Sequence, residues 1–175
     1  LAMRCHALVA TKDAWMQFPE VTLGIAPGIG GMVVPYRRWP KAAPVFHEML
    51  RSAKKLHAVE ALELGIVDRL ADSNDDLVRI AIDRVHALAG NVRTISSAPA
   101  TITAFGPGPE KKPVLSKEVV GVIERAIEEA ARANTLEAAL EIGYRAFGAS
   151  ACTKAAAEGV GAFLAGRKAD FEKTG

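Results

Sequence analysis

The sequence contains, at residues 18–31, the segment FPEVTLGIAPGIGG, which places one carboxylate, a turn and a glycine-rich helix entry close together. Pro19 fixes φ and has no N–H to donate, so it suits a turn or the first position of a helix and sets the direction of Glu20. Pro27-Gly28 is a strong turn signal. Gly30-Gly31 would leave backbone N–H groups uncovered where an apolar run begins. A helix starting there would direct its positive dipole end toward the turn.

Two interpretations of Glu20 follow from the residue types. A lone carboxylate on a rigid loop near a helix start can serve as a general acid or base. It can equally be a surface glutamate on a tight connection. Residue types alone favour the surface glutamate, because glycine-rich helix entries are common and the glycine spacing here is not that of a dinucleotide-binding fingerprint.

A resemblance changes that balance. Residues 18–31 resemble the Phe-x-x-Pro-Glu-x-x-x-Gly-x-x-Pro-Gly-x-Gly-Gly segment of the crotonase superfamily, the enoyl-CoA hydratases and isomerases. Three further segments resemble family motifs in the family's order. Residues 1–5 resemble the end of the helix after the oxyanion-hole glycines, residues 55–68 a helix-and-strand unit, and residues 158–171 the C-terminal E-G-x-x-A-F helix. No resemblance covers residues 91–113.

The resemblance implies a fold that is mainly α with a few short strands. The chain would be the C-terminal part of a crotonase-like α/β spiral fold and would include the family's helical trimerisation region. Residues 1–90 would end the core and carry the glutamate loop, residues 91–113 would form a loop, insertion or lid, and residues 114–175 would form the C-terminal helical region. Both oxyanion-hole N–H donors, and the first of the two glutamates of the hydratases, would lie upstream of Leu1.

The implied chemistry concerns an acyl-CoA thioester. An enolate-like intermediate is held by two backbone N–H groups, and glutamates supply the acid and base. Glu20 matches the second hydratase glutamate and is the candidate catalytic residue. No separate cofactor is implied, because coenzyme A is part of the substrate. The candidate substrate-binding residues are Gly28, Gly30 and Gly31, which would shape the floor of the site, Phe163, which would lie near the adenine, and Lys168, which would contact a phosphate.

Several alternatives stay open at this point. Gly166 stands where some hydratases have a phosphate-binding lysine, so Arg167 or Lys168 would have to substitute. Water addition to the 2,3 double bond of an enoyl-CoA cannot be separated from an isomerase or another crotonase activity, because the distinguishing residues precede Leu1. The isolated chain is expected to be inactive, and it could also act as a non-catalytic oligomerisation module. A homo-oligomer, a trimer or hexamer, is expected.

Composition supports a globular domain and argues against other classes. Of the 175 residues, 50% are hydrophobic and 24% charged, and the formal net charge is +2. This small positive balance does not indicate a nucleic-acid partner, and no apolar run approaches the ~18 residues that span a membrane. Cys5 and Cys152 are expected to be buried free thiols, with neither a disulfide nor a metal site, which is typical of a reducing, cytoplasmic compartment.

Periodicity and capping residues predict the order of elements. The predicted strands are residues 7–10 and 66–67, and the predicted helices are residues 31–39, 42–52, 58–64, 73–89, 116–133, 135 onward and 150–166. Ser73, Ser116 and Ser150 are the expected N-caps. Arg37 is expected at a solvated helix end and His47 on the solvent side of its helix. Ala155, Ala156, Gly159 and Gly161 are expected to permit close helix approach, because their side chains are small.

Overall fold

The computed structural model describes residues 1–108 and 114–174, and the described chain is mainly helical with a few short strands. The α-helices are α1 (Val34–Arg38), α2 (Ala43–Ser52), α3 (Ala58–Glu63), α4 (Asn74–Leu88), α5 (Lys117–Arg132), α6 (Leu136–Ala151) and α7 (Lys154–Leu164). The strands are β1 (Val9–Thr11), β2 (Trp15–Met16), β3 (Leu56–His57) and β4 (Arg69–Ala71). Short 3₁₀ helices are η1 (Ala2–Arg4), η2 (Glu20–Leu23), η3 (Pro40–Ala42) and η4 (Phe171–Lys173).

The chain forms two compact units, each built from two separate stretches. Unit 1 comprises Leu1–Met16 and Lys55–Ile95, and unit 2 comprises Gln17–Lys54 and the chain from Ser96 onward. The glutamate loop and the C-terminal helices therefore belong to the same unit although they are far apart in sequence. The expected division into residues 1–90, 91–113 and 114–175 groups neighbours in the sequence, whereas the two units group residues that are in contact. That division stays a prediction.

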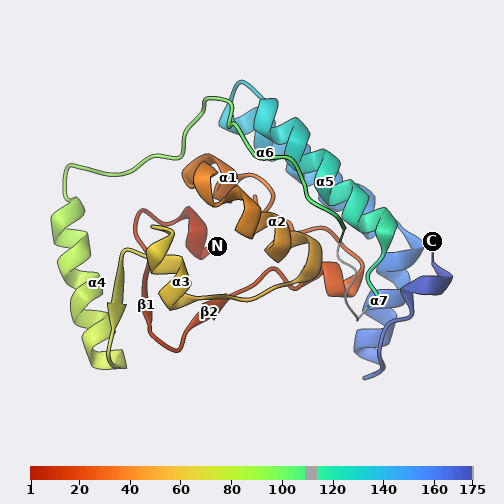
Figure 1. Cartoon of the computed structure of the whole chain (residues 1–175), viewed down its shortest axis with the longest axis horizontal. Helices are drawn as coiled ribbons and strands as arrows, with labels where there is room; N and C mark the ends of the chain where they lie inside the picture. Colours follow the sequence, from red (N-terminus) through yellow and green to blue (C-terminus); the bar gives the residue numbers. More distant parts are fainter. Residues whose placement is uncertain (109–113, 175) are drawn as a thin grey trace. The chain divides into compact units, whose positions relative to one another are not determined.

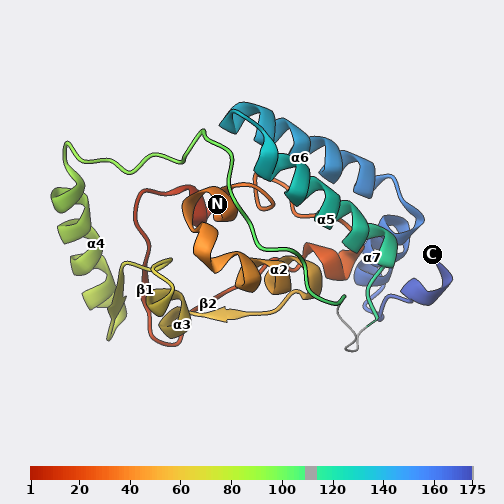
Figure 2. The same cartoon turned by 45° about the horizontal axis from the view of Figure 1, so that its top comes forward.

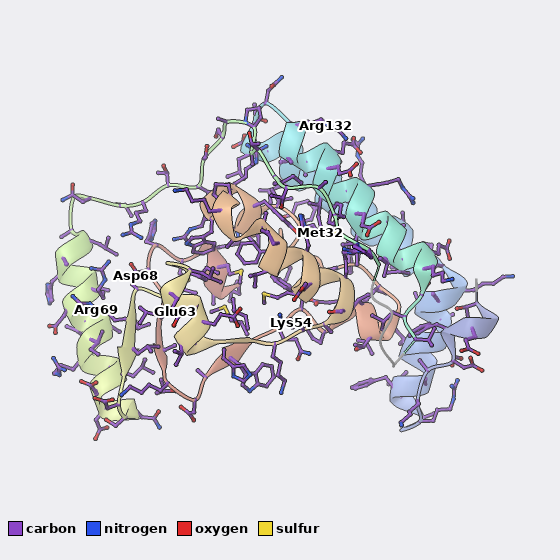
Figure 3. The ribbon with its side chains drawn as sticks, viewed as in Figure 1. Met32, Lys54, Glu63, Asp68, Arg69 and Arg132 are labelled. Atoms are coloured by element: carbon purple, nitrogen blue, oxygen red, sulfur yellow. The ribbon has the colours of Figure 1, made fainter. Side chains whose placement is uncertain are left out.

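Unit 1 is organised around the short parallel pair of β1 and β4, with α4 packed on both strands. Asp68, labelled in Figure 3 at the start of β4, joins these parts. Its Oδ2 accepts a hydrogen bond from the Leu8 N–H at 3.0 Å, and its Oδ1 accepts one from Arg84 of α4 at 3.1 Å. The carboxylate thus fastens α4 to the strand pair.

The strand positions correct two predictions. β1 covers residues 9–11 instead of 7–10, and the second strand is β4 at residues 69–71 instead of 66–67. Ile66 and Val67 are buried but lie in the connection from α3, where both N–H groups donate to the Ala61 carbonyl. An apolar dipeptide indicates burial, but it does not by itself indicate a place in a ladder.

Unit 2 is built on α2, α5 and α6. Figure 1 shows α5 and α6 side by side, followed by α7. The helix predicted at residues 116–133 is confirmed as α5, and it buries Val119, Ile123 and Ile127, which are each exposed by 1% or less. The predicted cap Ser116 is confirmed as well, because its Oγ accepts from the Val119 N–H at 3.3 Å. Ser73 likewise caps α4, accepting from Asp76.

Residues 96–107 form an irregular segment, here called the strap, which runs past α2 in Figure 2. Three buried side chains of α1 and α2 hold it. Arg37 donates to the Ser97 carbonyl at 2.7 Å, His47 Nε2 donates to the Thr103 carbonyl at 2.9 Å, and Arg51 donates to the Pro107 carbonyl at 2.9 Å. The strap is therefore anchored to unit 2, whereas residues 109–113 of the expected insertion lie outside the described residues.

The strap overturns two predictions about exposure. Arg37 is 5% exposed and His47 is 4% exposed, so neither is at a solvated surface. The cause is the strap itself, because its carbonyls cover the polar face of α1 and α2 and pair with it. A helical wheel shows only that this face is polar.

Both cysteines are exposed, which corrects the expectation of buried thiols, and neither forms a disulfide among the described residues. Each follows the last residue of a helix as its C-cap, Cys5 after η1 and Cys152 after α6. Among the described residues, no helix combines the length and the apolar character needed to cross a membrane. Within the same residues, no three His, Cys, Asp or Glu side chains are grouped to hold a metal ion.

Candidate functional site

Glu20 is the first residue of η2, with Pro19 as the N-cap. The turn ends at Gly24, whose φ of 68° is a left-handed conformation that glycine adopts readily. Two backbone bonds close it: the Gly24 N–H donates to the Val21 carbonyl at 3.2 Å, and the Ile25 N–H donates to the Glu20 carbonyl at 3.3 Å. Glu20 is therefore attached to a turn of four residues that two backbone hydrogen bonds close.

One carboxylate oxygen of Glu20, Oε2, is buried and has no hydrogen-bond partner among the described residues. Leaving a buried acceptor unsatisfied costs about 1–3 kcal/mol, so native proteins keep few such groups and usually for a reason. An oxygen in this state can take up a proton, or accept a hydrogen bond from a water or a ligand hydroxyl. These are the tasks of a general base or acid.

The turn that carries Glu20 docks on α7 through two glycines, and we call this contact the glycine junction (Leu23, Gly24, Ala155 and Gly159). A Cβ added to Gly24 would lie 2.6 Å from the Ala155 carbonyl carbon. A Cβ added to Gly159 would lie 2.9 Å from the Leu23 Cα, and closer still to the Leu23 carbonyl. The expected close approach of small residues in α7 is therefore confirmed at Gly159 and Ala155, and the element that approaches is η2.

Ser150 holds the next part of the loop. Its Oγ, fully buried in the last turn of α6, accepts from the Ala26 N–H at 2.9 Å and donates to the Phe147 carbonyl at 2.8 Å. The prediction that Ser150 caps the last helix is wrong. Thr153 caps it instead, with Oγ1 accepting from the Ala156 N–H at 3.1 Å, because Thr153 has the extended backbone that a cap requires.

The three candidate glycines lie in this docked loop. A Cβ on Gly28 would lie 3.5 Å from the ring of Phe147, and one on Gly30 would lie 2.9 Å from Leu140, so both glycines face α6. The Gly31 N–H donates to the Gly28 carbonyl at 3.0 Å, and α1 begins only at Val34. The expectation of an uncovered N–H at Gly31 was therefore wrong, since the turn itself satisfies that group. A role of these glycines toward a substrate stays a prediction.

Phe163 and Lys168 line one groove together with Thr22 and Leu23 of η2, and its cavity volume is about 820 Å³. Phe163 is 69% exposed, although it is a large apolar side chain. The structure thus brings both C-terminal candidates to the same hollow as the turn that Glu20 begins.

Arg167 and Lys168 differ in what they already bind. Arg167 makes a bidentate ion pair with Glu158, with N–O distances of 2.6 and 2.9 Å. Hydrogen bonding to Glu158 raises the pKa of Arg167. The Glu158 carboxylate also accepts from the Asp170 N–H at 2.8 Å, so it ties the chain after α7 back to the helix. Lys168 forms no ion pair among the described residues and is exposed in the groove. Of the two cations, Lys168 is therefore the one available to a ligand.

Sequence reasoning missed the contribution of Ser150 and underrated that of Gly159. The only local signal was the Glu158-Gly pair in the C-terminal motif, which indicated a family helix without indicating what it touches. The partners of both residues lie more than a hundred positions earlier in the chain. Spacing within a helix cannot reveal contacts of this kind.

Comparison with known proteins identifies the family. The enoyl-CoA hydratase/isomerase family model matches residues 1–102 of the chain. The chain belongs to this family. A probable enoyl-CoA hydratase of Rhizobium meliloti is 30% identical over 172 residues, covering 98% of this chain and 56% of the relative. A peroxisomal fatty acid beta-oxidation multifunctional protein of Oryza sativa is 40% identical over 83 residues, covering 46% of this chain and 11% of the relative.

The solved structures agree on the fold. A carnitinyl-CoA hydratase from Mycobacterium avium matches with a TM-score of 0.65 at 18% identity, covering 99% of this chain and 57% of that one. This likeness concerns the fold alone. Two curated relatives match 98% of this chain, and the chain spans 56% of the length of each of them.

Proposed function

We propose that this chain is the C-terminal, glutamate-bearing part of an enoyl-CoA hydratase, and that Glu20 is its acid/base residue. In the reaction, the oxygen of water bonds to C3 of the enoyl-CoA and a proton is added at C2, so the 2,3 double bond becomes a single bond. Glu20 would take the proton of the attacking water or deliver the proton to C2. The observation that carries the proposal is the buried, unpartnered Oε2 of Glu20, held on a closed turn within a family motif.

The groove beside η2 suits the coenzyme A part of the substrate. Phe163 presents an exposed ring that can stack on the adenine, and Lys168 presents a cation that can pair with a phosphate. Gly28, Gly30 and Gly31 would shape the floor near the thioester, the first two by keeping the loop thin against α6 and Gly31 by leaving room for Pro27 and Phe18. Specificity for the acyl chain would come from residues outside these contacts.

Assembly into a trimer, or a multiple of it, belongs to the same proposal. α7 exposes Val160, Phe163 and Leu164 by 41%, 69% and 79%, which is much apolar surface for one short helix. Exposed apolar surface of this kind usually marks an interface, and cyclic symmetry is the common way to close one.

Two preparations test the catalytic claim. The 175-residue chain alone is expected to show no turnover of crotonyl-CoA, because the family motifs that supply the oxyanion donors have no counterpart in it, and loss of even one such donor costs about 10²–10³-fold in kcat. The second preparation is a fusion of the chain, at Leu1, to the part of the Rhizobium relative that precedes the matched segment. Turnover is expected in this fusion.

In the fusion, Glu20→Gln is expected to lower kcat by about 10²–10⁴-fold, the range for removal of a general acid or base. Glu48→Gln is the matched control, because Glu48 is exposed and pairs at the surface with Lys54 at 2.5 Å. Equal rates for Glu20→Gln and Glu48→Gln would refute the role of Glu20.

A further inference from the structure

The glycine junction places backbone directly against backbone, and it does so beside the catalytic candidate. At Gly24 and at Gly159, the atoms that an added Cβ would meet first belong to the main chain of the partner segment, Ala155 and Leu23 respectively. A flexible side chain can swing away from a new methyl group, but a carbonyl within a closed turn cannot. The contact is therefore rigid in a way that ordinary side-chain packing is not.

Gly159 is costly for the helix that contains it. Glycine in a helix interior is about 1 kcal/mol less favourable than alanine. Gly161, two residues further along α7, has no atom within 4 Å of an added Cβ and is exposed, so nothing at that position requires a glycine. Gly159 is buried against Leu23, and its missing side chain is what allows η2 to seat.

The geometry of η2 links the position of Leu23 in this contact to the position of Glu20. Leu23 is the last residue of the turn and Glu20 is the first, and the Gly24 and Ile25 N–H groups close the turn onto Val21 and Glu20. Displacement of Leu23 therefore displaces the backbone of Glu20. Ser150 holds Ala26 just beyond the turn, so α6 and α7 together fix its C-terminal end.

We propose that the docking of η2 on α7, together with the bond from Ser150 of α6 to Ala26 just beyond η2, orients the Glu20 carboxylate, with Gly159 as the central positioning residue and Ser150 as the second. The inference rests on the proposed function of Glu20 and extends it. The C-terminal helices would be part of the catalytic apparatus through their backbone, in addition to lining the groove. Gly159 touches no reacting atom, and its effect passes through Leu23.

The test compares Gly159→Ala with Gly161→Ala in the 175-residue chain. Both variants add one methyl group to α7 and raise helix propensity equally, so they differ only in the contact with Leu23. The first readout is the carboxyl carbon signal of Glu20 in a glutamate-labelled sample, assigned by its loss in Glu20→Gln. The second is amide hydrogen exchange at Gly24 and Ile25, whose N–H groups close the turn.

Gly161→Ala is expected to leave both readouts as in the parent. Gly159→Ala is expected to move the Glu20 carboxyl signal and to speed exchange at Gly24 and Ile25 by tenfold or more, because the turn has to shift. In the fusion described above, it is expected to lower kcat by about 10²-fold with little change in KM, since a misplacement of about 1 Å is enough for such a loss. A variant with merely weakened packing would not show this split.

A folded Gly159→Ala variant with the parent's Glu20 signal and amide exchange would overturn the proposal. If this variant does not fold, Ser150→Ala decides, because it removes the hydroxyl that accepts from the Ala26 N–H and donates to the Phe147 carbonyl. Its control is Ser52→Ala, at an exposed hydroxyl that donates to its own helix. Ser150→Ala should move the Glu20 signal, and an unmoved signal contradicts the proposal. The spectra need no turnover, so a failed positioning role and a failed hydratase assignment give different results.

Discussion

Replacement of Arg37 by methionine should be among the most destabilising single changes in unit 2. The guanidinium donates to the carbonyls of Ser97, Ala130 and Ala133 at 2.7, 2.9 and 2.7 Å, and it also reaches the Ala98 and Ser96 carbonyls. No carboxylate pairs with it among the described residues. Its charge is instead balanced by the negative end of α5, where Ala130 and Ala133 lie.

The expected magnitude follows from these contacts. Methionine keeps most of the apolar stem but removes every donor, so three carbonyls lose their partner: Ala130 in a buried hydrogen bond, and Ser97 and Ala133 in partly buried ones. A hydrogen bond to a charged group is worth about 1.5–3 kcal/mol, and water can reach part of the strap, so we expect a loss of about 3–5 kcal/mol. The loss of stability in Arg37→Lys should be smaller than in Arg37→Met but still measurable, because an ammonium cannot reproduce the planar fork of five donors.

The assay is urea unfolding followed by far-UV circular dichroism. Arg132→Met is the control, on the α5 end labelled in Figure 3, where the side chain is 77% exposed and lies 3.7 Å from Glu128. A change within about 0.5 kcal/mol is expected for this surface site. Equal midpoints for Arg37→Met and Arg132→Met would refute the view that Arg37 anchors the strap to α5.

Three further predictions concern pH, ligand binding and assembly. Burial, with a smaller contribution from Arg51, lowers the pKa of His47, so the unfolded chain binds more protons than the folded chain below the ordinary pKa of about 6.5. The contribution of His47 to the free energy of unfolding should therefore be complete above that pH and fall as the pH drops toward the folded pKa. Urea midpoints at several pH values should show this dependence, and they should depend less on pH in His47→Gln. Lys168→Ala should weaken coenzyme A binding in calorimetry several-fold, whereas Lys154→Ala, at the exposed start of α7, should not; equal affinities would remove Lys168 from the site. Sedimentation velocity should show a trimer or a multiple of it, and a species that stays monomeric at high concentration would contradict the assembly proposal.

Local signals predicted the elements that depend on local chemistry. Ser116 and Thr135 each bond to a backbone N–H three residues later, so spacing alone identifies them as caps. The helix predicted at residues 58–64 is followed by Gly65 with a φ of 68°, a conformation that glycine commonly supplies just after a helix. The position of Glu20 on a turn followed in the same way from the prolines and glycines around it.

The rest could not be predicted because the deciding partners are remote in sequence. Arg37 was expected in solvent, and the carbonyls that bury it come from the strap and from the end of α5, about 60 to 96 positions away. Ser150 was read as a cap, and its partner is 124 positions earlier. Periodicity predicted the helix that became α4, yet its Val85 is 69% exposed, because among the described residues the main contacts of α4 are with β1 and β4.

The most direct test of the hydratase proposal is mass spectrometry of the product formed from crotonyl-CoA in oxygen-18 water by the fusion of this chain with the upstream part of its Rhizobium relative. We predict a 3-hydroxyacyl-CoA that carries the label on C3. We also predict that its rate of formation falls by about 10²-fold or more in Glu20→Gln. An unlabelled product with a shifted double bond, or labelled product formed equally fast by the variant, would contradict the proposal that Glu20 adds water to an enoyl-CoA.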